Sequence, residues 1–107
     1  MCIFCKIINK DIASNNILEN DNFIAFEDIN PQAKIHIVII PKVHIESFND
    51  ITPNIMSEMT IFIQEVSLMS GVKSDGYRLI TNIGKNGGQE VKHIHFHLLG
   101  GEKLESI

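Results

Sequence analysis

Histidine and apolar residues alternate from His93 to Leu98, and this alternation limits the folds open to the chain more than any other feature. In an extended strand, successive side chains point to opposite faces of the sheet. The histidines would therefore share one face, and the apolar residues would pack into a core on the other. These two sets are His93, His95 and His97, and Ile94, Phe96 and Leu98. The pattern predicts a strand between a hydrophobic core and a reactive surface.

A glycine-rich loop, Gly84–Gly88, precedes this strand. Glycines let consecutive backbone N–H groups point into a concavity that suits an anion such as phosphate. A zinc ion bound by all three histidines is disfavoured, because alternate strand residues stand roughly 6.6 Å apart and zinc–nitrogen bonds are about 2.0 Å long. A phosphate beside a row of imidazoles indicates phosphoryl or nucleotidyl transfer, although a lone histidine or a Gly-Gly turn often has no such role.

Length and composition exclude several classes of protein. A chain of 107 residues with 44% hydrophobic and 21% charged residues is typical of one globular domain. A net charge of −4 argues against a nucleic-acid partner, because binding that backbone needs a basic face. No apolar run approaches the roughly 20 residues of a membrane span, and the N-terminus lacks the layout of a secretory signal. We therefore expect no membrane partner and a cytoplasmic location.

The coarse secondary structure is α+β, with a largely antiparallel sheet. Thr52 is a suitable N-cap with Pro53 at the first helical position, and Gly71 is a plausible C-cap of one long helix. Apolar residues recur along that helix at steps of three and four. A short N-terminal helix and four strands complete the expected elements before the histidine strand, at residues 3–9, 17–20, 23–28, 34–40 and 77–82.

Cys2 and Cys5 form a Cys-x-x-Cys pair at the N-terminus. Redox chemistry would need this pair after a strand and at the start of a helix in a βαβ unit, which the chain does not offer. The pair is half of a tetrahedral zinc site, with His36, His44 and His93 as candidates for the other half. Two buried free thiols are the alternative, and His36 is better explained as a hydrogen-bonded core histidine.

Taken together, these residues resemble the histidine triad (HIT) family, whose signature is His-x-His-x-His followed by apolar residues. The similarity also covers segments 26–33, 40–44 and 87–89, with Asn82. It extends over nearly the whole chain and is nearest to the Hint-type nucleoside phosphoramidases. The resemblance implies that residues 1–107 form a single HIT domain, with about five strands, one long helix and a short N-terminal helix.

The resemblance also implies a mechanism. His95 would attack the α-phosphorus of a nucleotide derivative to give a nucleotidyl-histidine intermediate, which water then hydrolyses. His97 and the Gln89 amide would stabilise the transition-state charge, and His93 would orient His95. Asp28 would bind the ribose hydroxyls; on spacing alone, turn capping is its ordinary role. The residues expected at the nucleotide are Phe26, Asp28, Ile29, Asn82, Gly88, Gln89, Glu90, His95 and His97.

The family further implies a homodimer with a sheet continuous across two subunits. Some bacterial relatives bind zinc through residues that match Cys2, Cys5, His44 and His93. We interpret this zinc as structural, since the mechanism calls for no metal. Two departures affect specificity: Glu90 stands where animal phosphoramidases carry a serine, and the C-terminus lacks a tryptophan found in some relatives.

The leading hypothesis is therefore an enzyme that hydrolyses the P–N bond of purine nucleoside phosphoramidates, with AMP or an AMP conjugate as its ligand. Dinucleoside polyphosphate hydrolysis is the neighbouring activity. A nucleotide-binding adaptor or sensor with little turnover is a second class of function. A zinc or copper storage protein built on Cys2, Cys5 and the histidines is a third.

Overall fold

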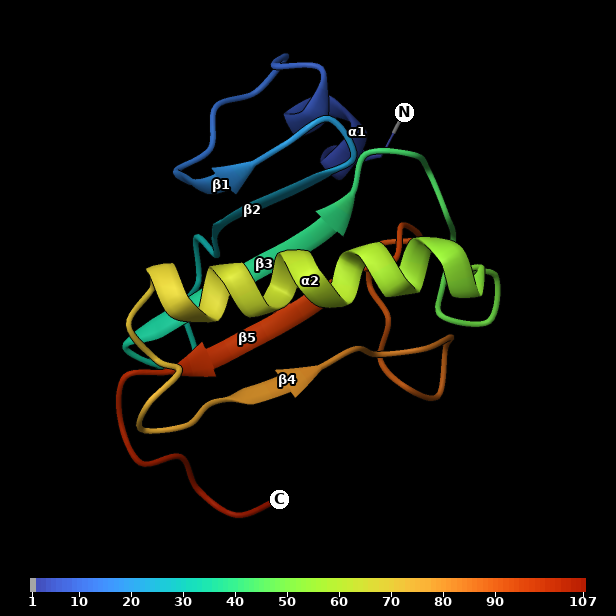
Figure 1. Ribbon diagram of the computed structural model, residues 1–107. Helices are drawn as coiled ribbons and strands as arrows, with labels where there is room; N and C mark the ends of the chain where they lie inside the picture. The colour runs from blue at the N-terminus through green and yellow to red at the C-terminus, as the bar shows by residue number, and fades with distance from the viewer. Residues whose placement is uncertain (1) are drawn as a thin grey trace.

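The computed structural model describes residues 2–107 and shows one antiparallel sheet with a helix on each face (Figure 1). The strand order is β1-β2-β3-β5-β4. The elements are α1 (Ile3–Ile8), β1 (Asn16–Glu19), β2 (Phe23–Glu27), β3 (Ile35–Pro41), α2 (Pro53–Met69), β4 (Arg78–Ile80) and β5 (Phe96–Gly100). The expected α+β fold, with five strands, one long helix and one short N-terminal helix, is confirmed.

The long helix α2 begins where the sequence predicts. The Thr52 side chain accepts a hydrogen bond from the backbone N–H of Ile55 at 3.3 Å, and Pro53 follows as the first helical residue. The C-cap is Ser70 rather than Gly71. Gly71 comes one residue later with φ of +81°, a left-handed conformation that glycine adopts without a steric penalty.

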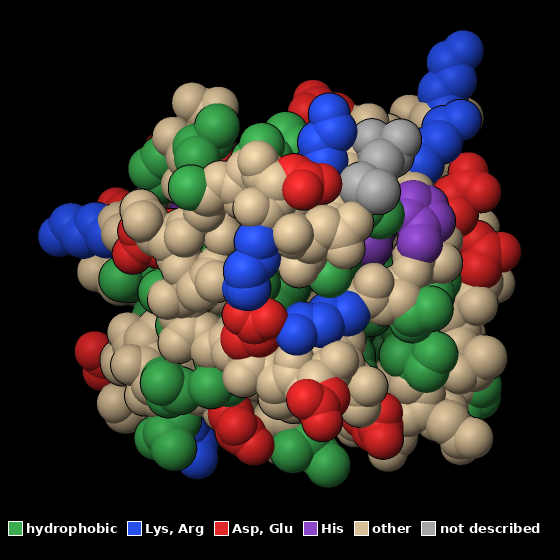
Figure 2. All heavy atoms as spheres, turned by 90° about the horizontal axis from the view of Figure 1, so that it is seen from above, with side chains coloured by type: hydrophobic (Ala, Val, Ile, Leu, Met, Phe, Trp, Pro, Cys, Tyr) green, Lys and Arg blue, Asp and Glu red, His purple; other side chains and the backbone are tan. Residues whose placement is uncertain are grey.

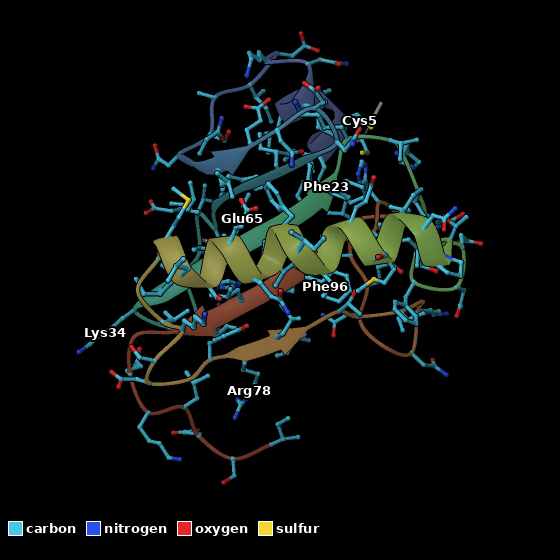
Figure 3. The ribbon with its side chains drawn as sticks, viewed as in Figure 1. Cys5, Phe23, Lys34, Glu65, Arg78 and Phe96 are labelled. Carbon is cyan, nitrogen blue, oxygen red and sulfur yellow. The ribbon has the colours of Figure 1, made fainter. Side chains whose placement is uncertain are left out.

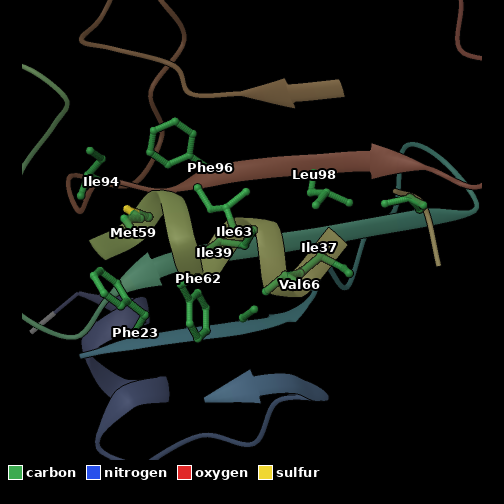
Figure 4. Close-up of a cluster of buried hydrophobic side chains, with 12 residues drawn as sticks. Phe23, Ile37, Ile39, Met59, Phe62, Ile63, Val66, Ile94, Phe96 and Leu98 are labelled. Carbon is green, nitrogen blue, oxygen red and sulfur yellow. The ribbon is translucent and has the colours of Figure 1, made fainter. Parts of the chain in front are cut away.

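The buried face of α2 packs on one face of the sheet (Figure 4). Met59, Phe62, Ile63 and Val66 on the helix meet apolar residues of β2, β3 and β5 there. Phe23 and Phe96 lie on this side of the sheet (Figure 3). The other face carries a smaller core in which α1 packs its buried residues on β2 and β3; this core contains Phe4, Ile7, Ile24, Phe26, Val38 and Ile40. The almost continuous apolar run of β3 is explained by burial on both faces.

The histidine segment differs in one respect from the prediction. β5 begins at Phe96 rather than His93, because the backbone N–H of Ile94 donates to the carbonyl of Ile45 in the connection after β3 and not to a neighbouring strand. The alternation of faces is nevertheless present: Ile94, Phe96 and Leu98 all belong to the core under α2. β4 is also shorter than expected, since the Thr81 hydroxyl donates to the carbonyl of His95 at 2.8 Å.

Within residues 2–107, no helix combines the length and the apolar character needed to cross a membrane. β1 and β4 are the edge strands of the sheet. Both therefore have one side without a neighbouring strand in this chain.

Candidate functional site

A cleft of about 870 Å³ lies on the face of the sheet opposite α2. α1, the β2–β3 connection and the end of the glycine-rich loop border it, and His95 and His97 lie in its wall. The other lining residues are Ile3, Phe4, Ile7, Ile12, Ala13, Ser14, Asn15, Phe26, Glu27, Asp28, Ile29, Asn30, Gln32, His36, Val38, Asn82, Gly88, Glu90 and Val91. Eight of the nine predicted nucleotide-binding residues therefore share one cleft, and Gln89 is outside it; the eight are Phe26, Asp28, Ile29, Asn82, Gly88, Glu90, His95 and His97.

His95 is held in one orientation by its own backbone neighbour. Its Nδ1 lies 2.8 Å from the carbonyl oxygen of His93 and can only donate there. The proton of a neutral His95 ring is therefore on Nδ1, and Nε2 keeps its lone pair. This Nε2 has no hydrogen-bond partner, whereas every buried polar side-chain atom among the described residues has one. The Nε2 atom must therefore be accessible from the cleft, although His95 is only 6% exposed. This ring is arranged as a nucleophile.

His97 presents the opposite polarity. The backbone N–H of Gln32 donates to Nδ1 of His36 at 3.0 Å, which places the His36 proton on Nε2. That Nε2–H donates to Nδ1 of His97 at 2.9 Å. A neutral His97 consequently carries its proton on Nε2. The rings of His95 and His97 lie 5.0 Å apart between centroids, so a lone pair and an N–H donor stand side by side.

His36 belongs to the site, although the sequence analysis assigned it to the core. It is hydrogen-bonded, as predicted, but its partner is a histidine of the cleft on another strand. The signal was the period of two along β3, because His36 shares a face with Val38 and Ile40, and both of these pack on the α1 side. Only the pairing of β3 with β5 brings that face to His97.

Burial lowers the pKa of His36 and of His97 below the ordinary value of 6.5. For His97, the neighbouring His95 and His36 act in the same direction, and Asp28 and Glu90 oppose them. For His36, Asp28 opposes burial. Both rings are therefore neutral near pH 7, which the hydrogen-bond chain requires.

Asp28 makes a turn-capping contact and also lines the cleft. Its Oδ1 accepts the backbone N–H of Asn30 at 2.8 Å, which is a turn-capping contact. Its Oδ2 lies 3.5 Å from Nε2 of His36, at the wall of the cleft. Together with Glu27 and Glu90 it gives the cleft three carboxylates. Lysine and arginine are absent from the described lining of this cleft.

The glycine-rich loop differs from its prediction at Gln89. The Gln89 side chain does not line the cleft: its Oε1 accepts the N–H of Gly84 at 3.0 Å, and its Nε2 donates to the carbonyls of Glu46 at 2.7 Å and Val91 at 3.0 Å. Gly88, with φ of +78°, lines the cleft as predicted, and its N–H donates to the carbonyl of Lys85 at 3.1 Å. The Gly88 N–H therefore closes the loop on itself, and the Gln89 amide also fastens the loop to the β3–α2 connection.

The N-terminal cysteines meet two histidines, in a group that we call the thiol cluster: Cys2, Cys5, His44 and His93. The two Sγ atoms lie 3.1 Å apart. Nδ1 of His44 is 3.2 Å and 3.7 Å from the sulfurs, and Nδ1 of His93 is 3.5 Å and 3.7 Å from them. Ligand atoms bound tetrahedrally at 2.0–2.3 Å stand roughly 3.3–3.8 Å apart. Three of these five distances fall in this range and the other two lie just below it, so the cluster is close to the dimensions of a four-ligand metal site.

His93 faces this cluster rather than the cleft. It is fully buried, and its Nε2 donates to the carbonyl of Pro41 at 2.8 Å, which leaves the Nδ1 lone pair for a metal. Burial, the largest influence, lowers the pKa of His93. Burial, followed by the hydrogen bond and charge of Cys2, raises the pKa of the Cys5 thiol. His36, the third candidate ligand, is not in the cluster. Figure 2, seen from above relative to Figure 1, shows histidine side chains (purple) at the molecular surface towards the right.

Comparison with known proteins places this geometry in context. The HIT domain family matches residues 9–104. An uncharacterised HIT-like protein of Helicobacter pylori is 54% identical over 103 residues, which are 96% of this chain and 99% of that protein. The purine nucleoside phosphoramidase of Escherichia coli is 44% identical over 105 residues, 95% of this chain and 88% of that protein. The structure of a HIT family hydrolase from Legionella pneumophila superposes with a TM-score of 0.92 at 41% identity, covering 98% of this chain and 96% of that one.

Acidification should destabilise the protein as the pH falls through 6.5, the ordinary pKa of histidine. The unfolded chain binds protons at His36 and His97 more readily than the folded protein, so the free energy of unfolding falls until the pH is below the lowered folded pKa values. Each ring contributes a slope of at most about 1.4 kcal/mol per pH unit. Urea unfolding followed by circular dichroism above and below pH 6.5 measures this slope.

The matched variant is His36→Gln, whose amide cannot be protonated in this range. It should show a shallower loss of stability with falling pH, while the contribution of His97 remains. An equal slope in the variant and the parent would contradict the neutral, buried state of His36.

Proposed function

The chain belongs to the HIT domain family, and on that premise we propose that it is a nucleotide hydrolase that cleaves the P–N bond of purine nucleoside phosphoramidates through a nucleotidyl-histidine intermediate. The observation that carries this proposal is the pair of neutral rings with opposite polarity, a bare Nε2 on His95 beside an Nε2–H on His97. The named activity of the Escherichia coli relative supports the choice of substrate class.

In the first step, Nε2 of His95 attacks the α-phosphorus, and the bond from phosphorus to the amine breaks. The Nε2–H of His97 donates to a non-bridging oxygen and stabilises the charge that develops there. The leaving amine takes up a proton from solvent water in the cleft. In the second step, water attacks the phosphorus, releases a proton to the solvent and frees His95, and a nucleoside monophosphate is the product.

The remaining cleft residues fit the rest of a nucleotide. Phe26 is buried at one wall, and Ile29 is 90% exposed at the rim, so the two can flank a purine base. The Oδ2 of Asp28 is available to accept ribose hydroxyls, since only Oδ1 is taken by the turn. Asn82 offers an amide to the phosphate or sugar.

The charge of the cleft favours substrates with one phosphate over dinucleoside polyphosphates. A polyphosphate brings several negative charges, which proteins usually meet with lysine, arginine or a metal ion. Three carboxylates and no described lysine or arginine line this cleft. A phosphoramidate brings a single negative charge next to the reacting phosphorus, which the Nε2–H of His97 can meet.

Replacement of the nucleophile tests the mechanism. His95→Asn should lower the rate of adenosine 5′-phosphoramidate hydrolysis by at least about 10³-fold, because the variant lacks the imidazole whose bare Nε2 forms the covalent intermediate. Binding of AMP, measured by calorimetry, should persist in the variant. In the parent, rapid acid quench and mass spectrometry should find the nucleotidyl group on the peptide that contains His95. An unchanged rate in His95→Asn excludes the covalent scheme, and AMP binding by a parent without turnover supports the adaptor hypothesis.

We propose that the thiol cluster binds one structural zinc ion. Two thiolates and two imidazoles in tetrahedral arrangement are a preferred zinc donor set, and the distances in the cluster fit it. The ion would neutralise two adjacent thiolates and fasten α1 to the segment that carries His93. The chemistry of the cleft does not need it.

Elemental analysis tests the metal assignment. We expect one zinc ion per chain in the purified protein and less than a tenth of that in the Cys2→Ser/Cys5→Ser variant. The parent should also lose thermal stability after chelation, because metal binding contributes to folding. A fully active parent without metal contradicts the assignment, and more than one ion per chain favours the storage hypothesis.

We propose that two copies of the chain pair through β4. This strand is an unpaired edge of the sheet, and it lies to one side of α2 in Figure 1. Leu79 pairs with Leu98 and so faces the α2 side, where it is 41% exposed. Ile61 and Leu68 on α2 are 59% and 64% exposed. Strand pairing through β4 would cover these apolar side chains and continue the sheet.

Light scattering during size-exclusion chromatography tests the dimer. The parent should elute with twice the mass of the chain, and Leu79→Lys should shift it towards the monomer by placing a charge in the interface. Phe48→Lys, also at an exposed apolar side chain but in the β3–α2 connection, should leave the mass unchanged. A monomeric parent would contradict the proposal.

A further inference from the structure

The side chain of Phe4 connects the thiol cluster to the nucleophile. Its ring meets His95 edge-on, with centroids 5.0 Å apart and planes at 73°. It also contacts His93 at 5.9 Å and Phe26 at 5.8 Å. Phe4 is 9% exposed and lies at the cleft wall. The His95 ring therefore contacts both Phe4 and His97.

The position of Phe4 depends on how α1 is fastened. The helix has only six residues, which is too short to be stable without tertiary contacts. Phe4 stands between Cys2 and Cys5, and both sulfurs contact the imidazoles of His44 and His93. The only side chains of α1 that are buried in the core are Phe4 and Ile7. The thiol cluster is thus the principal polar attachment of α1 to the rest of the described chain.

A second connection runs through His93 itself. Its ring takes part in the thiol cluster, and its Nε2 donates to the carbonyl of Pro41. Its own carbonyl accepts the Nδ1–H of His95 at 2.8 Å. A change in the cluster that turns the His93 ring would also strain the backbone that fixes the His95 tautomer. Both connections end on the same imidazole.

We propose that the thiol cluster positions the nucleophile: through Phe4 and the backbone of His93, it holds the His95 ring in the orientation and tautomer that expose Nε2 to the cleft. Phe4 is accordingly a positioning residue, in addition to being part of the wall. The inference rests on the proposed function for its kinetic consequence. The state of the His95 ring, however, can be measured without any substrate.

The first test is the tautomer of His95 in Phe4→Leu. Long-range ¹H–¹⁵N spectra of the ligand-free, metal-loaded parent should show His95 as a single species with its proton on Nδ1. Phe4→Leu removes the ring and should give a mixture of tautomers, whereas Phe4→Tyr keeps the ring and should restore the single species. Phe23→Leu is the matched control, because Phe23 is buried at 2% on the α2 side of the sheet, and it should keep one tautomer even if it lowers stability.

The second test is a double-mutant cycle on kcat. Misplacement of a reacting group by about 1 Å can cost about 100-fold in rate, so we expect Phe4→Leu to lower kcat by roughly 10- to 100-fold, beyond any change in KM. Cys2→Ser/Cys5→Ser should lower kcat to a similar extent. Because Phe4 and the cluster act on the same His95 ring, the kcat loss in the triple variant should be well below the product of the losses in Phe4→Leu and in Cys2→Ser/Cys5→Ser. Circular dichroism identifies any variant that fails to fold. In that case the comparison of Phe4→Tyr with the unmodified protein, in kcat and in the His95 tautomer, tests the proposal.

The outcomes separate the two proposals. Multiplicative effects in the cycle, or one unchanged His95 tautomer in both Phe4→Leu and the cysteine variant, would overturn the positioning role. A tautomer mixture in these variants would support the positioning role. If the unmodified protein at the same time failed to hydrolyse phosphoramidates, the proposed function alone would be overturned.

Discussion

The antiparallel pairing of β3 with β5 is the interaction on which the site depends. Its register runs from Ile35 opposite Gly100 to Ile39 opposite Phe96. This register brings His36 beside His97 and sends the alternate apolar residues of both strands under α2. A slip by one residue would turn the histidines into the core and the apolar side chains into the cleft. The hydrophobic core therefore fixes the chemistry of the opposite face.

Backbone groups, rather than charged side chains, set the polarity of the two cleft imidazoles. The carbonyl of His93 takes the proton of His95 on one nitrogen, and the N–H of Gln32 begins the chain that places the proton of His97 on the other. Backbone dipoles do not titrate, so this arrangement holds as long as the rings are neutral. Burial, which lowers the pKa of His36 and His97, keeps them so near pH 7. The low dielectric constant around the buried rings and their hydrogen bonds thus act together to keep both rings neutral and oriented.

Much of this arrangement was predictable from the sequence, where local pattern carries the information. The period of two from His93 to Leu98 predicted the two faces, and the family resemblance brought the two cysteines together with His44 and His93. His36 was assigned to the core because its partner lies 61 residues further along the chain, on a strand whose register no local pattern gives. Gln89 was misplaced for a related reason: a loop can satisfy its own polar groups, and only coordinates show that it does so.

The acidic lining of the cleft has a consequence for turnover. The phosphorus group of a nucleoside phosphoramidate carries one negative charge. The phosphate of a nucleoside monophosphate, the product of hydrolysis, carries nearly two at pH 7, because its second pKa is about 6. In the proposed reaction, that extra charge would appear in a cleft lined by Glu27, Asp28 and Glu90. Coulomb repulsion between these carboxylates and the product would rise once the reaction is complete. The carboxylates would accept a weakly charged substrate and promote release of the nucleotide product, which would limit product inhibition.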